Sequence, residues 1–217
     1  MVMLLSCNPT PTDHKTKSFS EFYENNNVKK ECEFKSSINQ NHYLHHCKLY
    51  HENGNLAQEG DFLDDSIETG WHYYFRKNGS IKAQREFLQI APLQYYLNRV
   101  YRFEINGDTD RTNSNFYKIT FDRDTVNAGD MINVIFKLEA PYFKSSYMNV
   151  ILTDSAGTDY RLPTNHLLYT TFSFNASGKG KQVLKGYLDE IEVEEKQADT
   201  LKVRKRPLYF KEPYFVK

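Results

Sequence analysis

The chain has 217 residues, enough for one large domain or two small ones. Its 28 Lys and Arg residues balance 28 Asp and Glu residues, so overall charge does not direct it toward nucleic acid, and we expect no nucleic-acid partner. Tyr and Phe are abundant, at 16 and 15 residues, which suits β-strands and argues against disorder. No apolar run approaches the roughly 20 residues that a membrane-spanning helix needs.

The first residues carry a signal for lipid attachment. Leu-Leu-Ser precedes Cys7, and residues 8–12 form a polar stretch with prolines that suits a flexible tether. This sequence resembles the lipobox of bacterial lipoproteins, in which the Cys receives a diacylglycerol. The resemblance implies lipidation of Cys7 and a place in the bacterial cell envelope, membrane-anchored on the periplasmic or outer-membrane side. The alternative is an ordinary apolar N-terminus with a chance Cys.

This segment departs from the lipoprotein pattern in two ways. It has no positively charged start, and its apolar part is much shorter than the about 7–15 residues of a signal peptide. We therefore expect the true start to lie upstream of Met1, or the segment to have been trimmed.

Three segments of the N-terminal half repeat one order of residue types: an aromatic residue, a turn, and an aliphatic residue. They are residues 22–28, 50–56 and 75–81. Each continues to a Phe, at Phe34, Phe62 and Phe87, which are 28 and 25 residues apart. Repeats at this spacing are typical of stacked structural units.

Each repeat contains a hairpin signal. Asn53-Gly54 and Asn78-Gly79 favour a type I′ turn, because both central residues of that turn need positive φ. Asn25-Asn26 can serve less well. An isolated two-stranded hairpin is marginal in water, so we expect the hairpins to stack into one continuous meander.

The repeat resembles a known family in the same residues. Asn-Gly-x-Leu/Ile, then Glu-Gly-x-Phe, then Gly-Trp-His-Tyr-Tyr, resembles the bacterial variant of the MORN repeat over about residues 20–90. The resemblance implies a scaffold or binding module without catalytic residues, sometimes part of an antitoxin. Candidate ligand contacts are Tyr50, Trp71, Tyr73 and Tyr74. Their alternative role is core packing between hairpins.

From about residue 99 a different rhythm begins. Short strands separated by turn signals, without a helical period, favour a two-sheet antiparallel sandwich. We expect strands at 100–105, 116–122, 131–138, 147–153, 167–175, 182–194, 201–206 and 208–216. Residues 124–136 loosely resemble the opening of immunoglobulin-like modules of bacterial surface proteins, which concerns fold alone. The prediction is an all-β chain: signal and tether at 1–18, a meander of stacked β-hairpin repeats at 19–92, and an antiparallel β-sandwich at 99–217.

Two neighbouring C-terminal segments carry alternating charges of opposite sign. They contain Glu190, Glu192 and Glu194, and Lys202, Arg204 and Arg206. If the segments pair about a turn near Ala198, each acidic side chain faces a basic one, and each pair contributes roughly 0.2–1 kcal/mol. We therefore expect a solvated charge ladder rather than a nucleic-acid patch. Lys205 has no place in this pattern.

Cys32 and Cys47 are a candidate disulfide. They lie on successive predicted strands, 15 residues apart, and an exported protein would meet an oxidising compartment. The bond would contribute about 3 kcal/mol by loop entropy. The alternative is two small buried hydrophobic residues.

The densest set of metal-ligand types lies nearby, at His42, His45, His46, Cys47 and His51. His45 and His46 point to opposite faces of any strand, and the spacing matches no recognised ligand pattern. We expect exposed strand histidines and no metal site.

No catalytic motif stands out. Residues 178–181, Gly-Lys-Gly-Lys, lack the frame of a phosphate-binding loop and favour a hairpin tip, while Asp64-Asp65 fits ordinary loop solvation. We expect neither an enzyme nor a cofactor. The favoured function is a non-catalytic envelope lipoprotein that binds an envelope protein partner within an assembly. The alternatives are a module for glycan or lipid headgroups near Trp71, and an antitoxin- or immunity-like partner.

Overall fold

The fold comes from a computed structural model that describes residues 17–39, 41–153, 159–162, 168–196 and 200–217. The chain is all-β, and no described segment forms a helix long and apolar enough to cross a membrane. Its contacts divide it into two units. The repeat unit holds the chain up to Leu97 together with Phe103–Asp108, and the sandwich unit holds Asn98–Arg102 and Thr109–Lys217.

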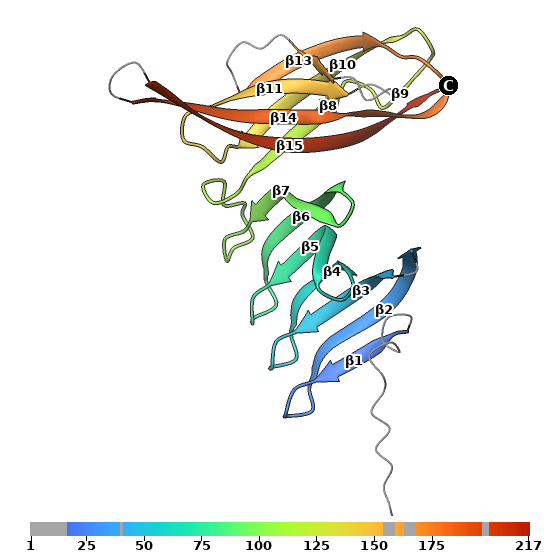
Figure 1. The fold of residues 1–217 in the computed structure, drawn as a ribbon, viewed down its shortest axis with the longest axis vertical. Coiled ribbons are helices and arrows are strands. Elements are labelled where there is room, and N and C mark those ends of the chain that lie inside the picture. The colour runs from blue at the N-terminus through green and yellow to red at the C-terminus, as the bar shows by residue number, and fades with distance from the viewer. Residues whose placement is uncertain (1–16, 40, 154–158, 163–167, 197–199) are drawn as a thin grey trace, which may run out of the picture. The chain divides into compact units, whose positions relative to one another are not determined.

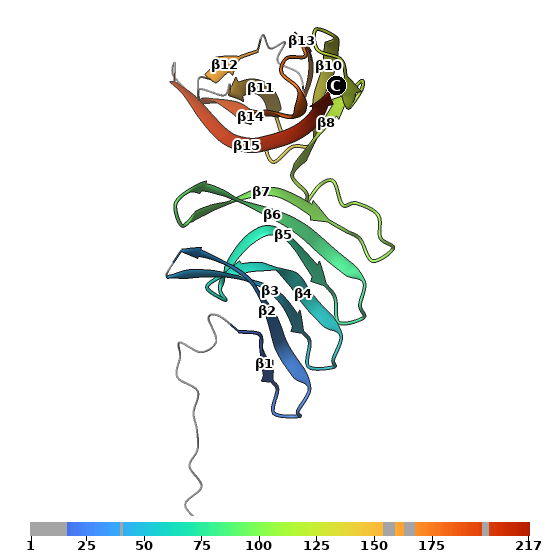
Figure 2. The same ribbon diagram turned by 90° about the vertical axis from the view of Figure 1, so that its right-hand side faces the viewer.

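The repeat unit is built on one seven-stranded antiparallel sheet with its strands in chain order, and only the end of the last strand, Asn98–Arg102, is counted with the sandwich unit. Figures 1 and 2 show these strands following one another step by step, each connected to the next at its end. The predicted meander of hairpins is therefore confirmed. The strands are β1 Phe19–Phe22, β2 Val28–Asn39, β3 His42–Tyr50, β4 Leu56–Leu63, β5 Ile67–Phe75, β6 Ile81–Ala91 and β7 Gln94–Arg102.

The hairpin turns differ from the predicted type. The tips are the five-residue segments 23–27, 51–55 and 76–80. In each, the N–H of the first residue donates to the carbonyl of the fifth, and the N–H of the fourth residue donates to the carbonyl of the first. Positive φ occurs only at the fourth position, at Asn26, Gly54 and Gly79. The type I′ prediction is therefore wrong, because that turn needs two such residues. These are longer loops with one left-handed residue and a strand bulge beside it.

A fourth tip extends the repeat past the predicted boundary at residue 99. Residues 104–108 close with the same two backbone hydrogen bonds, of 2.8 and 3.1 Å, and Gly107 takes the left-handed position with φ of 93°. Phe103–Asp108 belongs to the repeat unit, whereas the sequence prediction placed it in the sandwich. Asn106-Gly107 thus continues the repeat instead of separating two sandwich strands.

Side chains join one tip to the next. The first residue of a tip bonds to the backbone carbonyl that directly precedes the following tip. The bonds run from Tyr23 to Tyr50 (2.6 Å), from His51 to Phe75 (3.1 Å), and from Arg76 to Phe103. Asn27 and Asn55 add bonds of 2.8 and 2.7 Å to the carbonyls of Glu52 and Lys77. The fourth tip begins with Glu104, whose carboxylate cannot donate when ionised, so it cannot extend the series.

The sandwich unit consists of a three-stranded and a five-stranded sheet, ordered β13-β10-β8 and β12-β11-β14-β15-β9. The predicted sandwich of short strands is therefore confirmed in architecture. The strands are β8 Phe116–Phe121, β9 Thr125–Val126, β10 Met131–Ala140, β11 Ser146–Thr153, β12 Asp159–Arg161, β13 Tyr169–Asn175, β14 Gly180–Lys196 and β15 Thr200–Val216.

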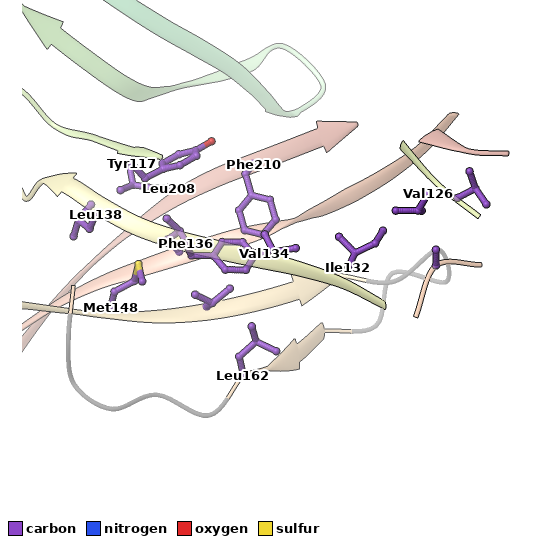
Figure 3. Packing of buried hydrophobic residues seen from close by; sticks show 14 residues of the cluster. Tyr117, Val126, Ile132, Val134, Phe136, Leu138, Met148, Leu162, Leu208 and Phe210 are labelled. Carbon is purple, nitrogen blue, oxygen red and sulfur yellow. The ribbon is translucent and has the colours of Figure 1, made fainter. Parts of the chain in front are cut away.

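The sandwich core follows from strict alternation on β10. Ile132, Val134, Phe136 and Leu138 are buried, and the residues between them are exposed. Figure 3 shows this row packing together with side chains of the other sheet. These include Met148, Leu208 and Phe210.

The two longest strands, β14 and β15, form one continuous antiparallel hairpin with no register shift. The sequence prediction divided β15 into two strands at Pro207, but this proline pairs with Asp189 inside the ladder. The predicted charge register is confirmed, and the turn near Ala198 lies outside the described residues. The pairs are Glu190 with Arg206, Glu192 with Arg204, and Glu194 with Lys202.

Candidate functional site

The repeat sheet has two chemically different faces, because successive side chains of a strand alternate. One face, called the disulfide face, carries apolar and aromatic side chains, and the other, called the acidic face, carries charged ones. The disulfide face includes Phe19, Cys32, Phe34, His45, Cys47, Phe62 and His72. The acidic face includes Glu31, Glu33, His46, Lys48, Glu59, Asp61, Trp71 and Tyr73.

The structure joins Cys32 and Cys47 by a disulfide between directly paired positions of β2 and β3. Both residues are buried, and Phe62 belongs to the same cluster, with Phe19 and Leu49 packed against it. Cys7, the candidate lipidation site, lies outside the described residues.

The strand histidines separate from one another, as their alternation requires. His45 is fully buried between the rings of Phe19 and Phe34, so the prediction of exposed strand histidines is wrong for this residue. Its Nδ1 lies 2.9 Å from Asp65, although the direction does not make a hydrogen bond. His46 points to the opposite face.

Asp64 and Asp65 differ from the predicted solvated loop. Both have positive φ, of 50° and 62°. The Asp64 carboxylate accepts the backbone N–H of Tyr43 at 3.0 Å and lies 2.5 Å from Nδ1 of His42. Asp64 therefore ties the β4–β5 loop to β3, a role that sequence spacing did not reveal.

His72 is the second buried histidine of the disulfide face. Its ring packs edge-on against Phe62 and Phe87, at 4.8 and 5.6 Å between centroids, and its Nε2 lies 2.8 Å from the carbonyl oxygen of Asp61. A Cβ at Gly60 would lie 2.4 Å from this ring, so the glycine makes room for it. Burial lowers the pKa of His72 below its ordinary value, against the smaller opposing effects of the hydrogen bond to the Asp61 carbonyl and of the Glu68 charge.

We expect His72 to make the repeat unit less stable as the pH falls below about 6.5, the ordinary histidine pKa. In this range the unfolded chain takes up a proton that the folded chain excludes, until the pH reaches the lower folded pKa. One proton costs at most about 1.4 kcal/mol per pH unit. Urea unfolding followed by fluorescence of Trp71, the only Trp, measures this slope. His72→Gln removes that part of the slope, and an unchanged slope in the variant would contradict the assignment.

The centre of the acidic face is a histidine held between two carboxylates. The ring nitrogens of His46 lie 2.8 Å from Asp61 and 3.2 Å from Glu59, and Lys35 bonds to Asp61 at 2.9 Å. Burial raises the pKa of Asp61, but the hydrogen bonds from Lys35 and His46 outweigh it and hold the pKa below its usual range. Beside this centre lies a hollow of about 420 Å³, lined by Ser18, Ser20, Glu31, Glu33, His46 and Lys48 among others.

Three of the four predicted contact aromatics lie on the acidic face. The Tyr50 hydroxyl donates to Glu31, and burial together with this carboxylate raises the pKa of Tyr50 to about 12. Trp71 and Tyr73 are two residues apart on β5 and share the face, where Tyr73 is 37% exposed. Tyr74 points to the opposite face.

On the opposite face, Tyr74 is held by a carboxylate and an arginine. Its hydroxyl donates to Glu68 at 2.6 Å, and the Arg85 guanidinium lies 4.5 Å from its ring centre. Burial and the Glu68 carboxylate raise its pKa. Tyr74 therefore belongs to the packing of the sheet, which was the alternative role considered for these aromatics.

The predicted charge ladder is not uniformly solvated. Glu190 is completely buried, and its carboxylate accepts hydrogen bonds from four donors. These are the Asn115 side chain (3.1 Å), the backbone N–H groups of Tyr142 (2.5 Å) and Phe143 (2.9 Å), and the Ser146 hydroxyl (2.9 Å). Arg204 bonds to Glu192 and Glu194, whereas Arg206 donates to the carbonyl of Asn98. Only the distal part of the ladder is exposed.

Residues 178–181 do not form the predicted hairpin tip. They span the end of the link from β13 to β14 and the first two residues of β14, and this link passes from the sheet of β10 to the sheet of β11 and β15. Gly178 and Gly180 both have positive φ, of 82° and 78°, and allow this change of direction.

Comparison with protein-family models, with curated proteins and with solved structures returns no match for this chain.

Proposed function

We propose that the protein is a non-catalytic binding module, in which the acidic face of the repeat sheet binds another protein of the cell envelope. A lipid on Cys7 holds the chain at the membrane in this proposal. The observation that carries it is the gathering of Tyr50, Trp71 and Tyr73 with a row of carboxylates on one face of one sheet. Aromatic residues within a polar rim are typical of protein interfaces.

The charges of the face indicate the chemistry of the partner. Four exposed or half-buried carboxylates, those of Glu31, Glu33, Glu59 and Asp61, lie on this face with Lys48 and with Lys35, which is bound to Asp61. A partner with basic side chains fits this surface, and complementary charge mainly adds association rate and specificity. The side-chain hydrogen bonds between successive tips and the disulfide hold the strands in register, so little of this surface needs to become ordered on binding.

Affinity purification of the lipidated chain from its native membranes tests the proposal. We expect a stoichiometric protein partner, and we expect Tyr73→Ala to lower its recovery about tenfold, the effect of losing a contact at the centre of an interface. Tyr169→Ala is the matched control, because Tyr169 is an exposed strand tyrosine of the sandwich unit. Equal recovery with Tyr73→Ala and with Tyr169→Ala would contradict a role for the acidic face. Loss of the partner in Cys7→Ala would support the anchor.

A glycan- or headgroup-binding module is the second candidate, favoured by the shared face of Trp71 and Tyr73. It is weaker because Tyr74, which this alternative also requires, lies on the other face beneath Arg85. Stacking of a sugar on Trp71 would change its fluorescence. An unchanged spectrum in glycans and in lipid vesicles would therefore exclude this candidate.

A further inference from the structure

The strand β15 has one paired edge and one that is mostly open. On one side β14 pairs with it from end to end, while on the other β9 pairs only with Phe215 and Val216 among the described residues. The N–H and carbonyl groups of Tyr209 both bond to the Asn98 side chain, at 2.7 and 2.8 Å. Backbone groups alternate along a strand, so the odd-numbered residues of β15 direct their N–H and carbonyl groups toward the open edge.

The second half of this edge is closed by local devices. Pro207 and Pro213 stand at odd-numbered positions and have no N–H to offer. Between them the Asn98 amide and the Tyr117 hydroxyl occupy the backbone of Tyr209. Natural sheets protect their edges in this manner, with prolines and covering groups. An uncovered stretch of the same strand therefore has free N–H and carbonyl groups to which another chain can pair.

The first half, at Leu201, Val203 and Lys205, carries no such device. No described strand pairs with this edge there. The side chains of Leu201 and Val203 are 66% and 51% exposed. Three successive outward N–H and carbonyl positions beside exposed apolar side chains form a template for an added strand.

The charges select the kind of strand. Lys202 and Arg204 lie in the adjacent row of side chains, with Glu192 and Glu194 flanking them on the β14 side. An added strand would place its own side chains on the other flank of these cations, where carboxylates at alternate positions repeat the arrangement of β14. The same edge of a second copy would instead place Lys202 and Arg204 against their own equivalents, which is repulsive.

We propose that the Leu201–Lys205 edge of β15 binds an extended segment of a partner protein as an added strand, with acidic residues at every second position. The exposed Lys205, which lies outside the charge ladder and interacts with Asp189, adds to the positive charge of this edge. The site lies in the sandwich unit and does not depend on the function proposed for the acidic face.

Fluorescence polarisation with the full chain and two labelled eight-residue peptides tests this inference. We expect saturable, salt-sensitive binding of a peptide of alternating threonine and glutamate, and none of its threonine–lysine counterpart. Val203→Pro removes an outward N–H while leaving the ladder to β14, as Pro207 does, and is expected to raise the dissociation constant about tenfold. Lys211→Pro is the matched control, because it changes an outward position of the same strand between two existing prolines.

Two results would overturn the inference: equal binding by Val203→Pro and the wild type, or self-association of the chain that Val203→Pro abolishes. A second variant guards against a folding defect in Val203→Pro. Lys202→Glu leaves the backbone unchanged and is expected to weaken binding of the glutamate peptide several-fold. Undiminished binding by this variant would exclude charge selection at the edge.

Discussion

Glu190→Ala is expected to destabilise the sandwich unit by about 3–5 kcal/mol. The substitution removes a buried carboxylate and leaves four donors without their acceptor. Two of these donors are backbone N–H groups between β10 and β11, which have few ways to find water. Urea unfolding followed by far-UV circular dichroism measures the loss. The stability of Glu190→Gln should lie between those of the wild type and of Glu190→Ala, because the glutamine amide offers one acceptor and two donors.

Glu194→Ala is the matched control for this prediction. Glu194 lies on the same strand and in the same charge ladder, but its side chain is 39% exposed and its ion pairs with Lys202 and Arg204 are solvent-screened. Its removal should cost less than about 1 kcal/mol. Similar losses from the two substitutions would show that Glu190 acts only as a ladder charge.

The contrast between these two glutamates shows where sequence reasoning ended. Alternation and opposite charge sufficed to predict the register of β14 with β15, because a strand has a period of two whatever surrounds it. Burial of Glu190 depends on the β10–β11 connection and on Asn115, which are 44 or more residues away in sequence. The alternating pattern contains no trace of these contacts.

In the repeat unit too, local patterns in the sequence predicted the strands, whereas contacts between distant residues were missed. Aromatic and Asn-Gly spacing predicted the meander, and Asn106-Gly107 carried the signal of the fourth tip but was interpreted as a separator. The turn type was wrong because an Asn-Gly pair fits both the two-residue and the three-residue loop. The burial of His45 was missed because ring packing from β1 and β2 is a tertiary contact that strand periodicity cannot reveal. Gly60 was noted as a motif residue, but its fit to His72 required coordinates.

Replacing both cysteines, Cys32→Ala with Cys47→Ala, is expected to destabilise the repeat unit by about 3 kcal/mol, mainly because the unfolded chain regains the freedom of a 15-residue loop. Urea unfolding monitored by Trp71 fluorescence reports this unit alone, since the chain has one Trp. A reducing agent should produce a comparable loss in the wild-type chain and none in the double variant. Cys7→Ala serves as the control for the third cysteine of the chain.

The position of the disulfide links it to the binding proposed for the acidic face. The disulfide joins β2 to β3, and these strands carry Glu31, Glu33, His46 and Lys48 on the acidic face. Its loss loosens the register that brings those charges together, so the double alanine variant should also bind the envelope partner more weakly, chiefly through faster dissociation. Unchanged stability would show that strand pairing alone fixes this register. Lost stability with unchanged binding would place the partner's contacts on the later strands, around Trp71 and Tyr73.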